Sequence, residues 1–186
     1  MILKRYRERK ESARVAGLLY KEAVDQARKP YFYAHLGVPD SLDGRFELIA
    51  LHLFMLLNRL KGEGEEADLL AKDLYDAFFA DMDRCLREMG AGDLGVGHKV
   101  QRMAEGFFGR LNAYDAACGP EAQEELSEVL RRNLFGTLEE VETNWLTTMA
   151  DYVSQGNTFL SQVPVSQLLQ GEVSFPGELT AKDNDD

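Results

Sequence analysis

Apolar residues recur every three or four positions along almost the whole chain, and strict two-residue alternation is absent from every segment longer than a few residues. The first spacing places apolar side chains on one face of an α-helix, whereas alternation is typical of a half-buried strand. The pattern predicts helices at about residues 12–28, 43–61, 65–89, 96–117, 120–134 and 138–152. We therefore expect an all-α fold, a single-domain bundle of six to seven helices.

Proline and capping residues mark the ends of these helices. Pro30 ends the first helix, and residues 31–42 form a turn-rich, partly buried connection. Pro120 is suited to the first position of the fifth helix. Thr137 and Glu140 have the spacing of a capping box before the sixth helix.

Composition divides the chain into three parts. Residues 1–11 form a basic N-terminal segment, and residues 12–170 form the helical domain. Residues 171–186 are acidic and contain proline and glycine, so we expect a disordered tail there. A chain of 186 residues is long enough to bury one sizeable core.

Charge is unevenly spread along the chain. The net charge of −11 argues against direct binding of nucleic acid, because phosphate recognition needs clustered Lys and Arg. Residues 1–14 nevertheless hold six basic residues against two acidic ones, so this segment carries +4 and the rest −15. We expect the basic start to extend the first helix and to contact an anionic membrane peripherally.

Neither a membrane span nor a secretory signal is predicted. The longest apolar run, Leu48–Leu57, has ten residues and is interrupted by His52, whereas a span needs about twenty. No apolar stretch follows the basic start, as it would in a signal peptide. Cys85 and Cys118 lie within helical patterns, which indicates reduced thiols and a cytosolic compartment.

Four glycines, at positions 90, 92, 95 and 97, separate two amphipathic segments. Residues 90–95 match G-x-G-x-x-G, but that fingerprint binds a dinucleotide only between a strand and a helix, and here it follows a helix. A helix C-cap, a turn and Asp93 as the next N-cap account for one or two of the glycines. Alternatively, the four glycines allow the backbone of a partner to approach the junction between the two helices closely.

No metal, cofactor or catalytic residue is predicted. His35, His52 and His98 are the only histidines, and none has a second ligand at the helical spacing that bundle metal sites use. Neither cysteine has the surroundings of an activated nucleophile. Histidines that are hydrogen-bonded in the core or exposed at the surface are a simpler explanation than a metal site. The many carboxylates are explained more simply as a solvent-exposed acidic face.

Two charged groups stand out. Asp43, Arg45 and Glu47 open the most apolar helix, where Asp43 can cap and Glu47 can pair with Arg45 in a buried polar clasp. Lys99, Arg102 and Arg110 share a broad stripe of the fourth helix, which suits either a docking patch or a solvated face.

Two blocks of sequence give the chain a family resemblance. One consists of Gly92–Gly97, Lys99, Arg102–Glu105, Phe107–Arg110 and Tyr114. The other consists of Tyr31–Tyr33, Leu36–Asp40, Leu42–Glu47 and Leu51–Leu53. Together they cover roughly residues 30–155 and resemble the ubiquinol–cytochrome c chaperone family, whose mitochondrial members assist cytochrome b on its way into the bc1 complex.

The resemblance implies an assembly chaperone that binds cytochrome b or its nascent chain, with a small co-chaperone or the ribosome as further partners. A compact chain with a short basic start favours a bacterial member, in the cytoplasm or peripheral at the inner membrane. The expected partner-binding residues are Tyr31, Phe32, Tyr33, Arg45, Phe79, Asp93, Gly95, Gly97, Lys99, Arg102, Phe107, Phe108 and Arg110.

Each of the expected aromatic contacts could instead fill the core. A helical small-molecule-binding protein or enzyme is the alternative, and it requires a polar pocket around Arg45 and His52 that Tyr33 and Glu47 would join.

Overall fold

The computed structural model describes residues 2–88, 93–122 and 124–177. In these ranges the chain is helical, with no strand, which confirms the all-α prediction. Six helices have eight residues or more, and the short helices α2 and α8 are additional. The helices are α1 (Ile2–Ala27), α2 (Pro30–Ala34), α3 (Leu42–Leu60), α4 (Glu65–Glu88), α5 (Asp93–Cys118), α6 (Leu126–Asn133), α7 (Thr143–Gln162) and α8 (Val165–Leu168).

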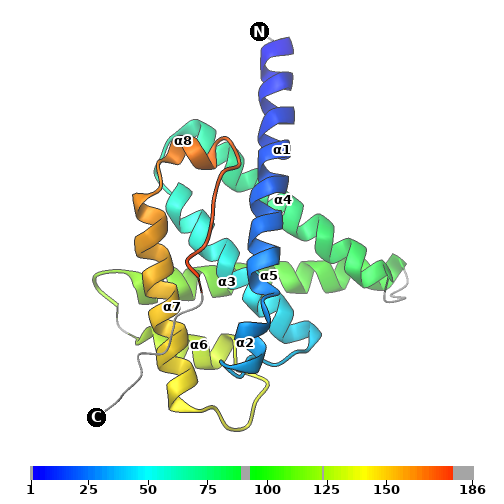
Figure 1. Cartoon of the computed structure of the whole chain (residues 1–186). Coiled ribbons are helices and arrows are strands. Elements are labelled where there is room, and N and C mark those ends of the chain that lie inside the picture. The colour runs from blue at the N-terminus through cyan, green and yellow to red at the C-terminus, as the bar shows by residue number, and fades with distance from the viewer. Residues whose placement is uncertain (1, 89–92, 123, 178–186) are drawn as a thin grey trace.

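Helix α3 lies at the centre of the molecule (Figure 1). Fourteen of its nineteen residues are buried, because α1, α4, α5 and α7 all pack against it. A helix that is apolar nearly all round is stable in water only when it is enclosed in this way. Ser41 caps its N-terminus by accepting a hydrogen bond from the Gly44 N–H at 3.1 Å, so the predicted cap at Asp43 is wrong.

Helix α1 begins at Ile2, so the basic start does extend the first helix. The second half of α1 packs on the body through Ala16, Leu19, Ala23 and Ala27, whereas its first half projects beyond the other helices (Figure 1). The basic residues described in the projecting half are solvent-exposed.

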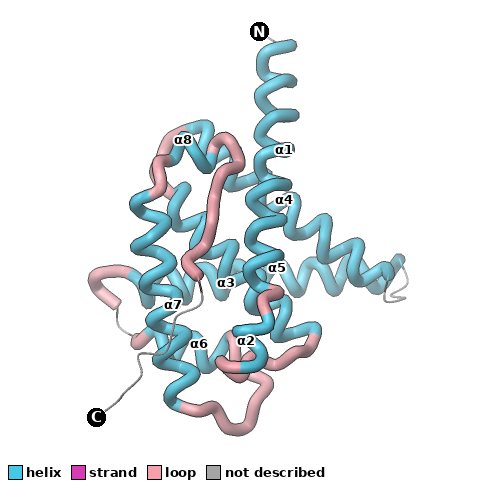
Figure 2. The backbone as a smooth tube through the Cα atoms, in the orientation of Figure 1, coloured by secondary structure: helices cyan, strands magenta, loops and turns pink. Residues whose placement is uncertain are grey.

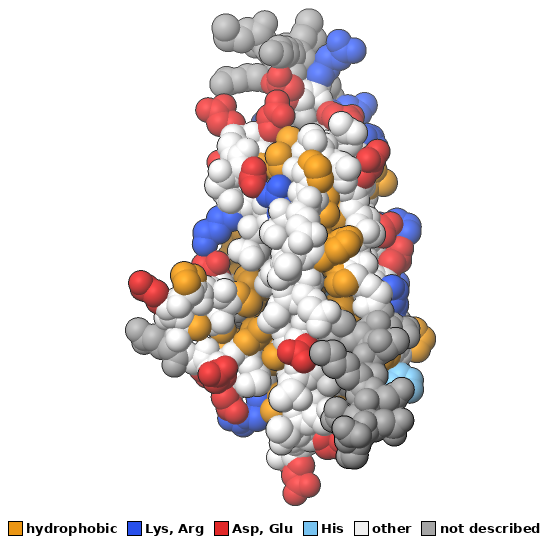
Figure 3. All heavy atoms as spheres, turned by 60° about the vertical axis from the view of Figure 1, so that its left-hand side comes forward, with side chains coloured by type: hydrophobic (Ala, Val, Ile, Leu, Met, Phe, Trp, Pro, Cys, Tyr) orange, Lys and Arg blue, Asp and Glu red, His pale blue; other side chains and the backbone are white. Residues whose placement is uncertain are grey.

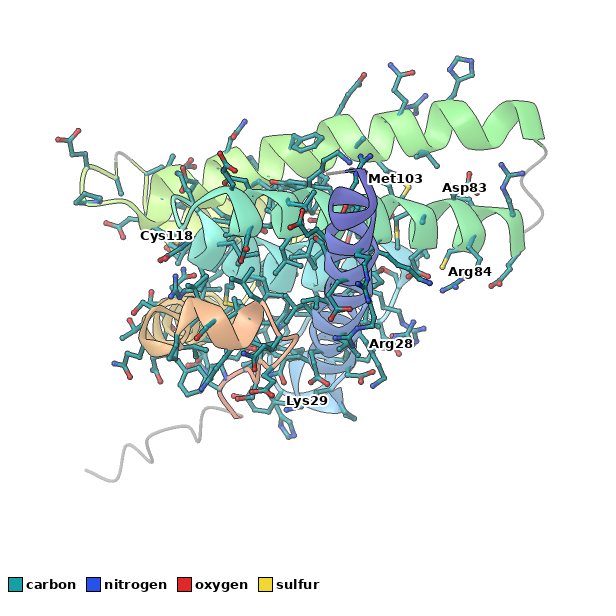
Figure 4. The ribbon with its side chains drawn as sticks, turned by 90° about the horizontal axis from the view of Figure 1, so that it is seen from above. Arg28, Lys29, Asp83, Arg84, Met103 and Cys118 are labelled. Atoms are coloured by element: carbon teal, nitrogen blue, oxygen red, sulfur yellow. The ribbon has the colours of Figure 1, made fainter. Side chains whose placement is uncertain are left out.

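Helices α4 and α5 form an antiparallel pair that extends away from the core on another side (Figure 2). Seen from above, both helices pass α1, with Asp83 and Arg84 on the outer half of α4 and Cys118 at the opposite end of α5 (Figure 4). Helix α5 starts at Asp93, three residues earlier than predicted, so Gly95 and Gly97 are helical. The rest of the predicted glycine junction, residues 89–92, lies outside the described residues.

The predicted helix boundaries fail after α5. Helix α6 begins at Leu126 rather than at Pro120, and α7 begins at Thr143, which rules out the capping box at Thr137. The apolar residues Leu138 and Val141 repeat at helical spacing but pack on the core from a loop. Tertiary packing therefore buries them without helical backbone.

The expectation of a disordered tail does not hold for residues 171–177. Val173 and Phe175 are partly buried against the core, and the ring of Phe175 contacts His52. Residues 178–186 lie outside the described part of the chain. Among the described helices, none combines the length and hydropathy needed to cross a bilayer.

Candidate partner-binding surface

An aromatic core joins α4 to α5. Phe78 of α4 and Phe107 of α5 are fully buried, with ring centroids 4.5 Å apart, and Phe46 of α3 lies 5.6 Å from Phe78. Close aromatic pairs of this kind hold helices firmly together. The side chains on the outer side of α4 and α5 are therefore held in fixed positions by this packed core.

A second layer of rings covers this core from outside. Tyr75 and Phe79 are half-buried, and Phe108 is 45% exposed, with its ring 5.4 Å from Tyr75 and 6.1 Å from Phe79. We call Tyr75, Phe79 and Phe108 the outer aromatic face. Phe107 and Phe108 are consecutive residues, so one points into the core while the other is exposed. An exposed ring beside two half-buried ones offers apolar surface to a partner.

A groove of about 330 Å³ opens beside Phe108, between the end of α3 and helices α4 and α5. Its lining is mixed: apolar residues, among them Phe54, Tyr75 and Phe108, alternate with polar ones such as Asn58, Asp68 and Asn112. The volume lies at the lower end of the range for ligand pockets, which suits one or two side chains of a partner.

An ion pair at the rim of the groove links two helices. Lys61, at the end of α3, binds Asp115 of α5 at 2.9 Å, and both side chains are exposed. Exposed ion pairs contribute only about 0–1 kcal/mol, so a partner could replace this one at little cost.

Arg110 is directed inward and does not form a free docking group. Its Nε donates to Glu47 at 2.5 Å, a second guanidinium nitrogen donates to the other carboxylate oxygen, and its Cζ lies 5.5 Å from the Phe46 ring centroid. Burial raises the pKa of Glu47, and the hydrogen bonds from Arg110 oppose that rise. The predicted local pairing of Glu47 with Arg45 is therefore wrong.

Arg45 is exposed and pairs with Asp40 at 2.8 Å. His52 is fully buried, and the Tyr33 hydroxyl donates to the Ala27 carbonyl at 2.8 Å. Arg45 and Glu47 have different surroundings because residues two positions apart lie on opposite sides of a helix, and here one side faces solvent and the other the core. The polar pocket that a small-molecule site would need around Arg45 and His52 is not assembled.

His52 belongs to a closed hydrogen-bond chain in the core. Its Nδ1 lies 2.7 Å from the Leu48 carbonyl, which can only accept, so Nδ1 carries the proton and Nε2 accepts from the Tyr152 hydroxyl at 2.8 Å. That hydroxyl accepts in turn from Gln26 at 2.9 Å. Burial lowers the pKa of His52 to about 4, which keeps the imidazole neutral.

The other predicted binding residues occupy several different places. Phe32 and Phe107 are core residues, so they cannot line a surface in this structure. Tyr31 is half-buried, Arg102 is exposed, and a side chain at Gly97 would meet open space. Gly95 lies in α5, while the side chains of Asp93 and Lys99 lie outside the described part.

Tyr75 and the groove residues other than Phe108 were not predicted as binding residues, although Tyr75 and Phe79 are four positions apart on α4. That spacing is a signal for a second apolar face. The described ranges contain no group of three or more His, Cys, Asp or Glu side chains that could hold a metal ion.

The fold and the outer aromatic face together define an all-helical domain suited to binding another polypeptide. The sequence model of the family described as ubiquinol-cytochrome C chaperone matches residues 34–175. The chain belongs to this family.

Individual relatives agree with that assignment. The chain is 25% identical over 156 residues to the ubiquinol-cytochrome-c reductase complex assembly factor 1 of Xenopus laevis, covering 83% of this chain and 77% of that protein. The human assembly factor 1 is 24% identical over 158 residues, covering 84% of this chain and 52% of the human protein. The chain thus spans about half the length of the human relative.

A solved structure has the same fold. The crystal structure of the Cbp3 homolog from Brucella abortus superposes with a TM-score of 0.81 at 34% sequence identity. The match covers 95% of this chain and 97% of the Brucella chain.

Proposed function

We propose that this protein is an assembly chaperone for the ubiquinol–cytochrome c oxidoreductase and that its client is cytochrome b or the nascent cytochrome b chain. Family membership carries the proposal, since the relatives are named as assembly factors of that complex. The outer aromatic face supplies a surface with suitable chemistry. The role needs no catalytic group, only reversible binding.

The client would lie across the outer aromatic face, with an apolar side chain in the groove beside Phe108. Cytochrome b is a membrane protein, so its segments expose apolar surface before insertion. An amphipathic or apolar helix gains affinity by burying such residues in a groove between two helices. Arg102, exposed on α5, would set the register through a charge pair at the edge.

The site of action is part of the same proposal. A bacterial protein would act in the cytoplasm, with the projecting basic half of α1 contacting the inner membrane, where cytochrome b is inserted. A small co-chaperone or the ribosome could bind at the tip of the α4–α5 pair, beside the helical Gly95 and Gly97. There, no side chain at Gly97 obstructs an approaching backbone.

The test is deletion of the gene in the native host, followed by haem spectra and immunoblots of the bc1 complex. We expect bc1 content to fall while other respiratory complexes persist, and tagged protein to capture cytochrome b after cross-linking. Normal bc1 content in the deletion strain would contradict the function. Restored assembly by a Phe79→Ala, Phe108→Ala double variant at wild-type level would contradict only the assigned surface.

A further inference from the structure

The segment Glu172–Gly177 lies across the helical body as a strap. It runs from α8 without helical turns and descends between α1 and α7 (Figures 1 and 2). Val173 and Phe175 are partly buried, whereas Glu172 and Ser174 are exposed. This alternation is that of an extended peptide with one face on a surface.

Phe175 packs against a buried aromatic cluster. Its ring centroid lies 5.0 Å from that of His52 at an interplanar angle of 84°, and the His52 ring lies 5.4 Å from Phe32 and 5.7 Å from Tyr152. Phe175 therefore packs edge-to-face on His52 of α3, whose ring is in turn flanked by Phe32 of α2 and Tyr152 of α7.

Gln26 of α1 binds the backbone of the strap. Its amide nitrogen donates to the Pro176 carbonyl at 3.3 Å and to the Tyr152 hydroxyl at 2.9 Å, and the side chain is buried. A fixed donor to a main-chain carbonyl, next to a pocket for an alternate side chain, is a common way for proteins to bind extended peptides.

The strap is joined to the body by few polar contacts. In the described part of the chain, the Glu172 N–H donates to the Gln167 carbonyl at 2.9 Å, and the contact from Gln26 follows four residues later. Gly171, just before the strap, has φ +83°, and a Cβ there would lie 2.7 Å from the Leu18 side chain. The turn onto the body is thus fixed, while the strap beyond it rests mainly on Val173 and Phe175.

Hydrophobic side chains remain accessible around this region. On the face that carries α7, they are visible in strips between acidic residues (Figure 3). At the edge of the strap, Gly156 of α7 lies within ordinary contact of Pro176, since a Cβ there would be 3.9 Å from the Pro176 ring; the close neighbour of that Cβ would be the Met55 sulfur, at 2.7 Å.

From these contacts we infer that the groove between α1, α3 and α7 is a second polypeptide-binding site. The strap occupies it in cis, and an extended segment of a partner polypeptide with an aromatic residue two positions after an aliphatic one binds there when the strap leaves. The inference goes beyond the proposed function, because it concerns a different surface from the outer aromatic face and does not depend on the client's identity.

The strap competes strongly because it is tethered. A short tether gives an effective concentration on the order of millimolar, so an identical peptide added in trans binds weakly to the intact protein. Weakening the strap without cutting the chain should therefore uncover the site.

The experiment uses full-length protein and a fluorescein-labelled peptide with the sequence of residues 171–177 and blocked ends. We expect Phe175→Ala to bind this peptide at least about tenfold more tightly than the wild type, because the tethered competitor has lost its ring. The same peptide with alanine in place of its phenylalanine should not bind. Phe159→Ala, which removes another partly exposed ring, from α7, serves as the matched control and should bind as the wild type does.

A second measurement follows the His52 imidazole by NMR. In Phe175→Ala the ring should titrate closer to its ordinary range, and added peptide should restore the wild-type titration. Equal peptide affinity of Phe175→Ala and the wild type, or equal binding of the alanine peptide, would overturn the inference. If Phe175→Ala does not fold, Val173→Ala replaces it with a smaller gain of about threefold expected, and no gain overturns the inference.

Discussion

Glu47 and Arg110, 63 positions apart in sequence, form a two-point ion pair that fastens α3 to α5. Glu47 is only 5% exposed, so its charge depends on this one cation for compensation. Arg110 in turn lies over the Phe46 ring and is held on the side of the α4–α5 pair that faces the core. The pair fixes the orientation of α5 and, through it, the outer aromatic face.

Replacing Arg110 by alanine should destabilise the fold. The variant leaves the Glu47 carboxylate buried without a partner, which typically costs about 3–5 kcal/mol. Urea unfolding followed by circular dichroism measures the loss. Arg102→Ala is the matched control on the same helix, and because Arg102 is exposed its stability should change by less than about 0.5 kcal/mol. Equal stability of the two variants would mean that the Glu47–Arg110 pair is not structural.

Phe108→Ala should separate folding from function. Phe108 is 45% exposed, so we expect a stability loss of no more than about 1 kcal/mol, while bc1 content in cells falls several-fold because the client loses a ring from its binding surface. Immunoblots of the complex in a complemented deletion strain give the readout. Leu42→Ala removes a comparably exposed apolar side chain from the start of α3 and should leave bc1 content unchanged. A folded Phe108→Ala protein that supports full assembly would place the client elsewhere.

Stability should fall on acidification through the protonation of His52. Its folded pKa of about 4 lies below the ordinary value of 6.5, so the unfolded chain binds the proton first. The stability that neutral His52 contributes is fully present above pH 6.5 and is lost as the pH falls towards 4. The free energy of unfolding should decrease by up to about 3 kcal/mol over this range. Thermal melts between pH 7 and 4.5 should show a steeper decline for the wild type than for His52→Gln. Parallel declines would show that other groups dominate in this range.

The projecting half of α1 should bind anionic membranes. Each basic residue near such a surface contributes about 1 kcal/mol, and Arg7, Arg9 and Lys10 are all exposed. Deleting residues 1–10 should abolish co-sedimentation with vesicles that contain phosphatidylglycerol, and the interaction should weaken with salt. Vesicles of phosphatidylcholine alone are the control. Unchanged sedimentation after the deletion would exclude this role.

Local pattern was sufficient to predict the helices that pack along one continuous stripe. Leu70, Leu74, Phe78, Met82 and Leu86 recur at helical spacing in the sequence and are all buried on one face of α4, because helical period alone decides which side chains share a face. The position of α3 at the centre also followed from its composition, since a helix without a polar face must be enclosed.

Pattern failed where loops carry buried side chains. Leu138 and Val141 have helical spacing but pack from a loop, and Phe175 lies in a segment with the composition of a disordered tail. In both cases contacts with distant residues, among them His52 for Phe175, outweigh local preference.

The sequence by itself determined the fold class, the main helices and the family, because these depend on period and on ordered blocks of residues. Only the tertiary structure decided which charges are paired. Arg110 could equally have faced solvent until α3 placed Glu47 beside it, whereas the helical spacing of Phe107 with Leu111 and Tyr114 already indicated which of the two adjacent phenylalanines is buried. The physical reason is that burial is a property of the neighbours that the chain brings together, and local spacing does not identify them.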